Sequence, residues 1–299
     1  MNLLVTGAWK YTDEQLKTVE EIGHKIVFMQ NESEELTCSV EDIEGVICNG
    51  LFLYHDIEKF TSLKYIQLTS AGYDRVPMDY INERRIKIFN ARGVYSIPMA
   101  EFAVSGVLQL YKQSRTFYEN QKNNKWEKQR GLLELHGKTV LIVGCGSVGI
   151  ECAKKFSAFG CQVFGIDIKP YKNNLFYEMR DLSALDAFLQ VSDIVVLTLP
   201  LTEETKWLFD ENRFVFLKER AVLVNIARGA IIDEKALLNA LRSKLYGAVL
   251  DVFEQEPLED KSLLWNMKNV VLTPHVSFIG DGNGERLFEV IKNNLMSVL

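Results

Sequence analysis

The stretch Thr139-Val-Leu-Ile-Val-Gly-Cys-Gly-Ser-Val-Gly149 indicates how the middle of this 299-residue chain folds. It starts with an apolar run, which predicts a buried strand. The following residues have the spacing G-x-G-x-x-G and lead into a helical pattern. Such a turn lets backbone amides approach a pyrophosphate, with the N-terminus of the next helix facing the anion. The residues expected to bind a dinucleotide in this turn are Gly144, Gly146, Ser147, Val148 and Gly149.

The glycine spacing needs support from its surroundings, because 19 glycines in 299 residues produce it by chance in roughly one such chain in thirteen. That support is Asp167, which lies 18 residues after Gly149 at the end of the next predicted strand. A carboxylate at that point accepts hydrogen bonds from an adenosine ribose and repels a 2′-phosphate. We therefore expect NAD as the cofactor, while Lys169 and Lys172 leave NADP open. The alternative is a plain tight turn with a surface aspartate.

Short apolar runs alternate with helical patterns on both sides of this turn, which is typical of parallel α/β architecture. From residue 138 onward the runs predict strands at 139–143, 162–167, 194–199, 221–226, 247–251 and 270–273. Helices are expected at 148–159, 182–190 and 234–242. This number of elements suits a doubly wound sheet of six or so strands.

The first 90 residues repeat the same alternation. They predict strands at 2–6, 25–29, 45–48, 65–69 and 86–89, with a charged helix at 13–21. A long helical pattern follows at 98–119, and a polar surface connection with Trp126 as a packing anchor is expected at 121–130. The last 24 residues after His275 are too few for another domain, although their apolar stripe predicts a helix. That helix must pack on a domain formed earlier in the chain.

The composition excludes several classes of protein. With 34 basic and 40 acidic residues and a net charge of -6, the chain has no basic surplus for a nucleic-acid partner. No apolar run approaches the ~20 residues that span a bilayer, and the apolar start at residues 1–5 is too short for a secretory signal. The 5 Cys form no Cys-x-x-Cys pair and the 4 His have no metal-ligand spacing, so we expect no metal site. These features predict a cytoplasmic, two-domain protein that binds no membrane.

Three polar groups fall at the ends of predicted strands in the second half of the chain: Arg228, Glu256 and His275. Ligands of doubly wound sheets bind beyond the carboxyl ends of the strands, which is where these residues lie. Each also has a plainer interpretation, as a surface ion pair, a solvated acidic loop or a structural histidine. Their occurrence together with the glycine turn favours a functional site.

The sequence resembles the D-isomer-specific 2-hydroxyacid dehydrogenases over nearly its full length, and most closely from Gly144 to His275. Residues 225–229 resemble the arginine motif of that family, 247–258 its glutamate motif, and Thr273-Pro274-His275 its histidine motif. Further similar stretches are 199–205 near the cofactor, Ser70-Ala71-Gly72-Tyr73-Asp74 at the substrate carboxylate, and Ala100-Glu101 in the helix between the domains.

The resemblance implies two doubly wound parallel-sheet domains, with a Rossmann cofactor domain inserted into a flavodoxin-like substrate domain. The substrate domain would consist of 1–97 plus 277–299, and the NAD-binding domain of 98–276. It also implies a homodimer formed through the cofactor domain.

The activity implied is reduction of a 2-oxo acid to a D-2-hydroxy acid by hydride transfer from NAD(P)H, in a reversible reaction. Arg228 and the amides of Ala71 and Gly72 would bind the substrate carboxylate, and Arg228 would also polarise the ketone. His275 would act as the acid or base, with Glu256 favouring its cationic form. The resemblance further assigns Pro200, Thr205, Ile226, Ala227 and Asp251 to the cofactor, with Asp251 on the nicotinamide side.

Two other functions stay open at this point. One is an NAD-sensing, corepressor-like binding protein without significant turnover. The other is a dehydrogenase of a related fold that acts on formate, phosphite or an amino acid. Within the family, 48–52 lacks the basic residues that a phosphoglycerate enzyme carries there. An apolar substrate pocket and a plain core position are both possible interpretations of Leu51, Phe52, Tyr73 and Phe278.

Overall fold

A computed structural model describes residues 1–36 and 38–298 of the chain. These residues form two compact units, one made of Met1–Tyr95 and the C-terminal segment from Gly280, the other of Ser96–Ile279. The expected domain boundaries, 97/98 and 276/277, fall within a few residues of these points. In the described ranges, every helix is too short or too polar to cross a membrane.

The larger unit contains a 7-stranded parallel sheet in the order β12-β11-β10-β9-β6-β7-β8. Its strands are β6 (Thr139–Val143), β7 (Gln162–Ile166), β8 (Glu178–Arg180), β9 (Ile194–Leu197), β10 (Val222–Asn225), β11 (Gly247–Leu250) and β12 (Val270–Leu272). Counted from β6, this is the strand order 3-2-1-4-5-6 of a Rossmann sheet, extended by one more parallel strand. The order reverses between β6 and β9, so the glycine turn after β6 lies at the point where doubly wound sheets bind ligands.

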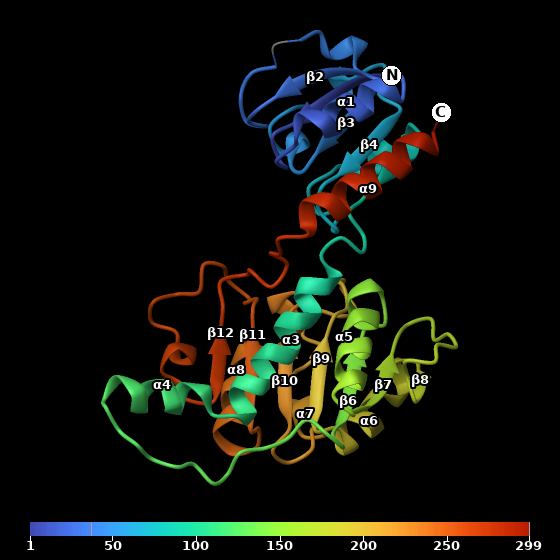
Figure 1. Cartoon of the computed structure of the whole chain (residues 1–299). Helices are drawn as coiled ribbons and strands as arrows, with labels where there is room; N and C mark the ends of the chain where they lie inside the picture. The colour runs from blue at the N-terminus through green and yellow to red at the C-terminus, as the bar shows by residue number, and fades with distance from the viewer. Residues whose placement is uncertain (37, 299) are drawn as a thin grey trace. The chain divides into compact units, whose positions relative to one another are not determined.

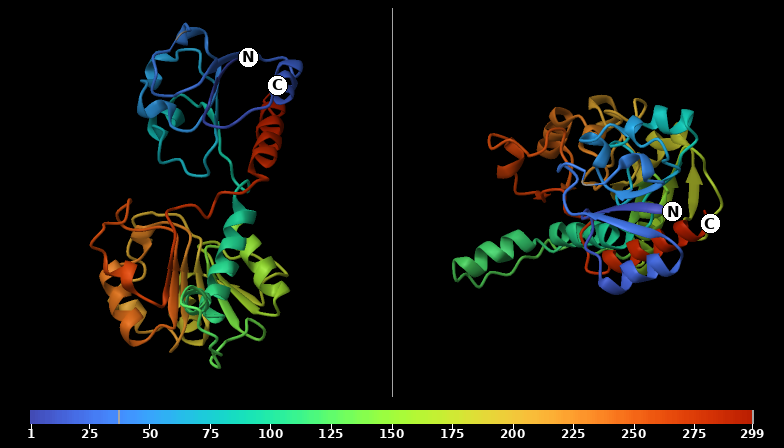
Figure 2. Two further views of the ribbon diagram at one scale, coloured as in Figure 1. Left: turned by 60° about the vertical axis from the view of Figure 1, so that its left-hand side comes forward. Right: turned by 90° about the horizontal axis from the view of Figure 1, so that it is seen from above.

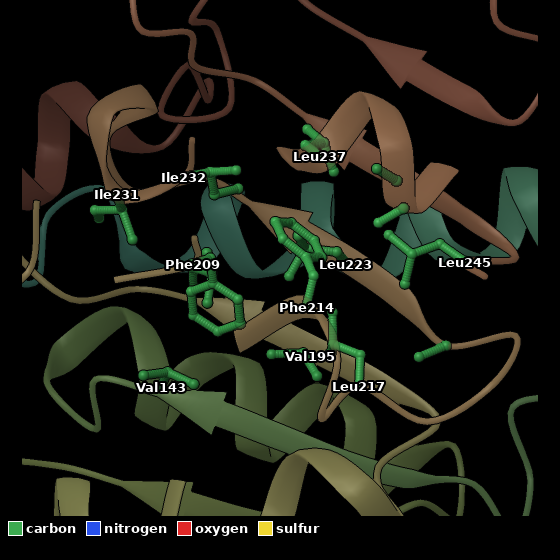
Figure 3. Close-up of a cluster of buried hydrophobic side chains, with 14 of the residues drawn as sticks. Val143, Val195, Phe209, Phe214, Leu217, Leu223, Ile231, Ile232, Leu237 and Leu245 are labelled. Carbon is green, nitrogen blue, oxygen red and sulfur yellow. The ribbon is translucent and has the colours of Figure 1, made fainter. Parts of the chain in front are cut away.

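Helices cover both faces of this sheet (Figure 1). One face packs against α3 (Ser96–Tyr111) and α5 (Ser147–Ala158). The other packs against α6 (Leu185–Val191), α7 (Glu211–Phe214) and α8 (Glu234–Ser243). Figure 3 shows the core on this second face, where Phe209 and Phe214 lie between the sheet residues Val195 and Leu223 and the helix residue Leu237. Because both faces are buried, most of these strands are continuous apolar runs that do not alternate with polar residues, which is why sequence detects them well.

The six strands predicted for this unit are confirmed, and the seventh, β8, was missed because its residues are polar. Several observed strands end one or two residues before the predicted ends. Asp167, Thr198 and Asp251 therefore stand just beyond the ladder, where their side chains bond to neighbouring loops.

The long helix predicted at 98–119 is wrong in one respect, because the chain forms two helices there. After α3 the backbone turns at Gln113, whose φ is 51°, and continues as α4 (Ser114–Lys122). Figure 2 shows α4 and the following segment projecting away from the rest of this unit. The prediction that Trp126 anchors this segment by packing is also wrong, since its side chain is 97% exposed.

The smaller unit contains a 5-stranded parallel sheet in the flavodoxin-like order β2-β1-β3-β4-β5. Its strands are β1 (Asn2–Thr6), β2 (Lys25–Met29), β3 (Gly45–Cys48), β4 (Tyr65–Leu68) and β5 (Lys87–Phe89), all close to the predicted ranges. One face is covered by α1 (Asp13–Glu21) and α9 (Asn283–Met296), and the other by α2 (Met78–Glu83), a short helix that the sequence did not reveal. The C-terminal helix α9 thus packs on the sheet built by the first 90 residues, as its apolar stripe required (Figure 1).

Candidate active site

Two glycines of the turn after β6 are required by the fold of the chain itself. Gly144 has φ of 98°, and a Cβ there would lie 2.6 Å from the backbone nitrogen of Leu199. A Cβ on Gly149 would lie 2.2 Å from the carbonyl oxygen of Gly144, so α5 and β6 approach each other too closely for any side chain. The first glycine therefore makes the turn, and the third permits the helix to pack on the strand.

Gly146 has a different role, because a Cβ there would meet no atom within 4 Å. Its backbone is in an ordinary extended conformation, so neither packing nor φ requires glycine at this position. In the part of the chain that the structure describes, the N–H groups of Gly146, Ser147 and Val148 have no acceptor. Open space and unused amides at the N-terminus of a 12-residue helix fit a dinucleotide phosphate. The residues present thus fit the NAD that the sequence predicts.

We expect Gly146→Ala to leave the fold intact and to raise the Kd for NADH by at least about tenfold, because the new methyl group occupies the space in front of the helix. Fluorescence titration with NADH measures the affinity, and thermal unfolding measures the stability. Gly149→Ala is the matched control: its Cβ collides with the Gly144 carbonyl, so the unfolding temperature falls. An unchanged NADH affinity in Gly146→Ala would argue against a pyrophosphate at this turn.

Asp167 lies against the glycine turn. One carboxylate oxygen accepts the Cys145 N–H at 2.8 Å, and the other accepts the Lys169 N–H at 3.0 Å. The carboxylate is half-buried, and each oxygen keeps a lone pair for a further donor. Tyr171 lies nearby, since its hydroxyl donates to the Cys145 carbonyl at 2.6 Å. This arrangement places a carboxylate beside the turn, as ribose recognition needs.

Cys145 occupies the interior of the turn and is 1% exposed. Burial, with a smaller contribution from Asp167, raises the pKa of its thiol to about 12. A thiol in this environment is not a nucleophile at neutral pH. Cys145 therefore serves as a small buried side chain that fills the interior of the turn.

The other residues that the resemblance assigned to the cofactor bond to or pack against neighbouring residues of the chain. Thr205 is buried, and its hydroxyl donates to the Pro200 carbonyl and accepts the Thr202 N–H. Ile226 and Ala227 place their side chains in the two hydrophobic cores, so only their backbone is left to contact a ligand. The backbone of Leu199, before Pro200, lies against Gly144.

The three polar candidates follow three adjacent strands, because β10, β11 and β12 are neighbours in the sheet. Backbone hydrogen bonds continue the ladder beyond the strand ends. The Asp251 N–H donates to the Asn225 carbonyl at 3.0 Å, and the His275 N–H donates to the Asp251 carbonyl at 2.8 Å. The loops that carry Arg228, Glu256 and His275 are therefore brought together at the carboxyl edge, as the sequence predicted.

Arg228 is positioned by a turn that Asn225 stabilises. The buried Asn225 side chain accepts the Ala227 N–H and donates to the Arg228 carbonyl at 3.0 Å. A Cβ on Gly229 would lie 1.8 Å from the Phe253 carbonyl carbon, so the arginine loop and the glutamate loop touch backbone to backbone. Sequence reasoning missed Asn225, although a polar residue ending a fully buried strand was a signal for it.

His275 and Glu256 are in direct contact. The His275 Nδ1 lies 2.8 Å from one Glu256 carboxylate oxygen, and the Phe253 N–H donates to the other at 3.1 Å. With Nδ1 donating to the carboxylate, Nε2 is left for a substrate. The two side chains are 41% and 36% exposed, so a ligand can reach them.

The backbone around His275 is strained and held by Asp251. His275 has φ of 54°, a conformation that costs about 1–3 kcal/mol in a residue other than glycine. Asp251 is fully buried, and its carboxylate accepts bonds from the Thr273 hydroxyl and from the N–H groups of Val276 and Ser277. These bonds fix the loop that carries His275, and the assignment of Asp251 to the nicotinamide side stays a prediction.

In the smaller unit, the loop after β4 carries the residues expected to bind a carboxylate. The Asn90 side chain donates to the Ala71 carbonyl at 2.7 Å, and the Ser70 hydroxyl donates to the Gly72 carbonyl at 3.1 Å. Within residues 1–36 and 38–298, neither the Ala71 nor the Gly72 N–H has an acceptor. The four residues for which a pocket and a core position were both possible differ in exposure. Leu51 is fully buried in the core, Phe52 is partly buried, and Tyr73 and Phe278 are 40% and 39% exposed.

Comparison with known proteins agrees with this geometry. A family model described as the NAD binding domain of the D-isomer specific 2-hydroxyacid dehydrogenases matches residues 104–277. Glyoxylate reductase of Thermococcus kodakarensis is 34% identical over 280 residues, which cover 88% of this chain and 82% of the relative. D-3-phosphoglycerate dehydrogenase of Methanocaldococcus jannaschii is 33% identical over 270 residues, covering 88% of this chain and 51% of the relative. The chain therefore spans about half the length of that second relative.

Among solved structures, a D-isomer specific 2-hydroxyacid dehydrogenase family protein from Aeromonas salmonicida has a TM-score of 0.81 and 30% identity to this chain. The match covers 98% of this chain and 93% of that one. Both parallel sheets, the glycine turn and the polar residues after β10, β11 and β12 thus occur in the order that the resemblance implied. The chain belongs to the D-isomer-specific 2-hydroxyacid dehydrogenases, a family of oxidoreductases with an NAD-binding domain.

Proposed function

We propose that this enzyme reduces a 2-oxo acid to the D-2-hydroxy acid, reversibly, with NADH as the reductant. The observation that carries the proposal is the contact between His275 and Glu256. Their two loops and the loop of Arg228 follow adjacent strands, at the same sheet edge as the glycine turn. An imidazole with a carboxylate on its far nitrogen supplies the proton that ketone reduction needs. Formate oxidation needs no such proton, so this pair favours ketone reduction.

The residues of the chain would have the following roles. When bound, the reduced nicotinamide supplies a hydride to the substrate carbon. Arg228 binds the substrate carboxylate and stabilises the negative charge that develops on the ketone oxygen. His275, protonated on Nε2, donates its proton to that oxygen, and Glu256 stabilises the imidazolium before the transfer. Asn225 and Asp251 hold the two loops in place.

The amides of Ala71 and Gly72 are proposed to bind the same substrate carboxylate as Arg228. The support for this is the resemblance of residues 70–74 to the family's substrate loop, together with the unused N–H groups of that loop. Cys145 and the other cysteines take no part.

We also propose a homodimer, in which α4 and the segment after it contact a second copy. Trp126 is 97% exposed and Tyr118 is 64% exposed on this projecting segment (Figure 2). Aromatic side chains so exposed on an extended arm are typical of interfaces. A cytoplasmic location stays a prediction from the sequence.

A steady-state panel of 2-oxo acids tests the function. With NADH and glyoxylate, hydroxypyruvate, pyruvate and longer apolar 2-oxo acids, we expect at least one substrate to reach the kcat of ~1–10³ s⁻¹ usual for enzymes. NADPH should be used less well than NADH, because Asp167 repels the 2′-phosphate. If NADH binds but every acid in the panel is inert, the chain is a dinucleotide-sensing binding protein and the proposal is wrong.

A further inference from the structure

Glu32 lies at the carboxyl ends of β1 and β3 in the smaller sheet. One of its carboxylate oxygens accepts the Thr6 hydroxyl and the Asn49 N–H, each at 2.7 Å, and the other accepts the Gly50 N–H at 2.7 Å. Thr6 ends β1, while Asn49 and Gly50 directly follow β3. The strand order of this sheet reverses between β1 and β3, and ligands of doubly wound sheets bind at that switch point.

The donors around Glu32 form a small anion site that the chain fills with its own carboxylate. Two successive backbone N–H groups and a hydroxyl converge on one charged group, and such charge-assisted bonds are strong. Glu32 is half-buried, and in the described ranges no ion pair neutralises it. Tyr11 lies close by: burial raises the pKa of its hydroxyl, and the charges of Cys48 and Glu32 raise it further.

This carboxylate lies next to the loop expected to bind substrate. β3 and β4 are paired, with Cys48 opposite Leu68, and the Thr69 N–H donates to the Cys48 carbonyl at 2.8 Å. Asn49 and Gly50 are therefore about one strand spacing, ~5 Å, from the start of the loop that carries Ala71 and Gly72. If the carboxylate of a 2-oxo acid rests on those amides, a C3 substituent directed toward β3 would come close to Gly50.

One cation approaches the same place. The Cδ of Arg75 lies 3.7 Å from the position of a Cβ on Gly50, and Glu32 lies 3.5 Å from it. Arg75 would attract a second negative charge on the substrate, whereas Glu32 would repel it. Arg75 is exposed, so water screens its charge, whereas three hydrogen bonds fix the Glu32 carboxylate. The fixed charge therefore has the larger effect.

We propose that Glu32 determines substrate specificity: it holds the Asn49–Leu53 segment in place and, through its negative charge, selects 2-oxo acids with an uncharged C3 substituent over those with a phosphate or a second carboxylate. The inference rests on the proposed function.

The test is the ratio of kcat/KM for hydroxypyruvate to kcat/KM for 3-phosphohydroxypyruvate. We expect the wild type to favour hydroxypyruvate by at least about tenfold, and Glu32→Gln to reduce that preference by about 10- to 100-fold, the size of one like charge within ~6–8 Å. The glutamine oxygen still accepts from Thr6 and Asn49, while the bond from the Gly50 N–H is lost, so two of the three bonds continue to hold the segment. Glu44→Gln is the matched control, because Glu44 accepts the Asn2 N–H and a Lys64 bond at the opposite edge of the same sheet. Its ratio should equal that of the wild type, and thermal unfolding checks that both variants fold.

A ratio that Glu32→Gln leaves unchanged would overturn the inference. So would a wild type that prefers the phosphorylated acid and loses that preference in Arg75→Gln, since Arg75 would then recognise a second anion. Calorimetric binding of both acids to the enzyme with NAD⁺ separates this inference from the proposed function. If neither acid is reduced but the Kd ratio still changes in Glu32→Gln alone, the role of Glu32 holds and the reductase activity fails. If the Kd ratio does not change either, the role of Glu32 is wrong as well.

Discussion

Replacing His275 by glutamine lowers kcat for the best 2-oxo acid by about 10²–10⁴, while the Kd for NADH changes by less than about twofold. Glutamine keeps hydrogen-bonding capacity but donates no proton at neutral pH. The loss should therefore appear in turnover and leave the dinucleotide turn, which follows a different strand, unaffected. Stopped-flow reduction and NADH fluorescence titration measure the two quantities.

Glu256→Gln provides the companion measurement. It keeps the contact with the His275 ring but removes the negative charge 2.8 Å from Nδ1. We expect a smaller loss of kcat than in His275→Gln. His136 is the control, because it precedes β6 and is distant in sequence from the loops of Glu256 and His275. His136→Gln should leave kcat unchanged. Near-normal turnover in His275→Gln would mean that another group donates the proton.

Replacing Arg228 by alanine lowers kcat/KM for a 2-oxo acid by at least about 10³, because one guanidinium both binds the carboxylate and stabilises charge on the ketone oxygen. Arg228→Lys should recover only part of the loss, since an ammonium group lacks the two-pronged geometry of a guanidinium. Both KM and kcat are expected to change, in contrast to His275→Gln, where kcat dominates.

Arg220 is the matched control for this experiment. It precedes the same strand, β10, and its guanidinium lies 5.0 Å from the ring centre of Tyr246 at the opposite edge of the sheet. Arg220→Ala removes an equal charge and should leave the kinetics close to those of the wild type. If Arg220→Ala and Arg228→Ala lose the same activity, the effect of Arg228 is on stability or net charge and not on the substrate.

Much of the fold was predictable because both sheets are parallel and buried on both faces. Most of their strands are continuous apolar runs, and the longer helices between them have an apolar stripe. The exceptions are polar or local: β8 reads Glu178-Met-Arg180, and the break between α3 and α4 depends on the backbone of a single residue, Gln113. Neither leaves a periodic signal in the sequence.

The candidate site was predictable where topology alone determines it. Residues that follow adjacent parallel strands meet at one edge, so Arg228, Glu256 and His275 could be placed near each other from their positions in the chain. The positioning residues were harder, because their partners are distant in sequence: Glu32 bonds to Gly50, and Asp251 to Ser277. The bonds of Asp251 to the histidine loop leave no trace in the sequence, so only the resemblance indicated a role for this residue.

The most direct test of the central claim is the fate of the hydride. With NADH deuterated at both C4 positions of the nicotinamide and a 2-oxo acid that the enzyme turns over, we predict a product with one deuterium at C2 and the D configuration, by mass spectrometry and chiral chromatography. His275→Gln should form the same product far more slowly. A product without deuterium at C2 would contradict direct hydride transfer, and a product with the L configuration would contradict the proposed D specificity.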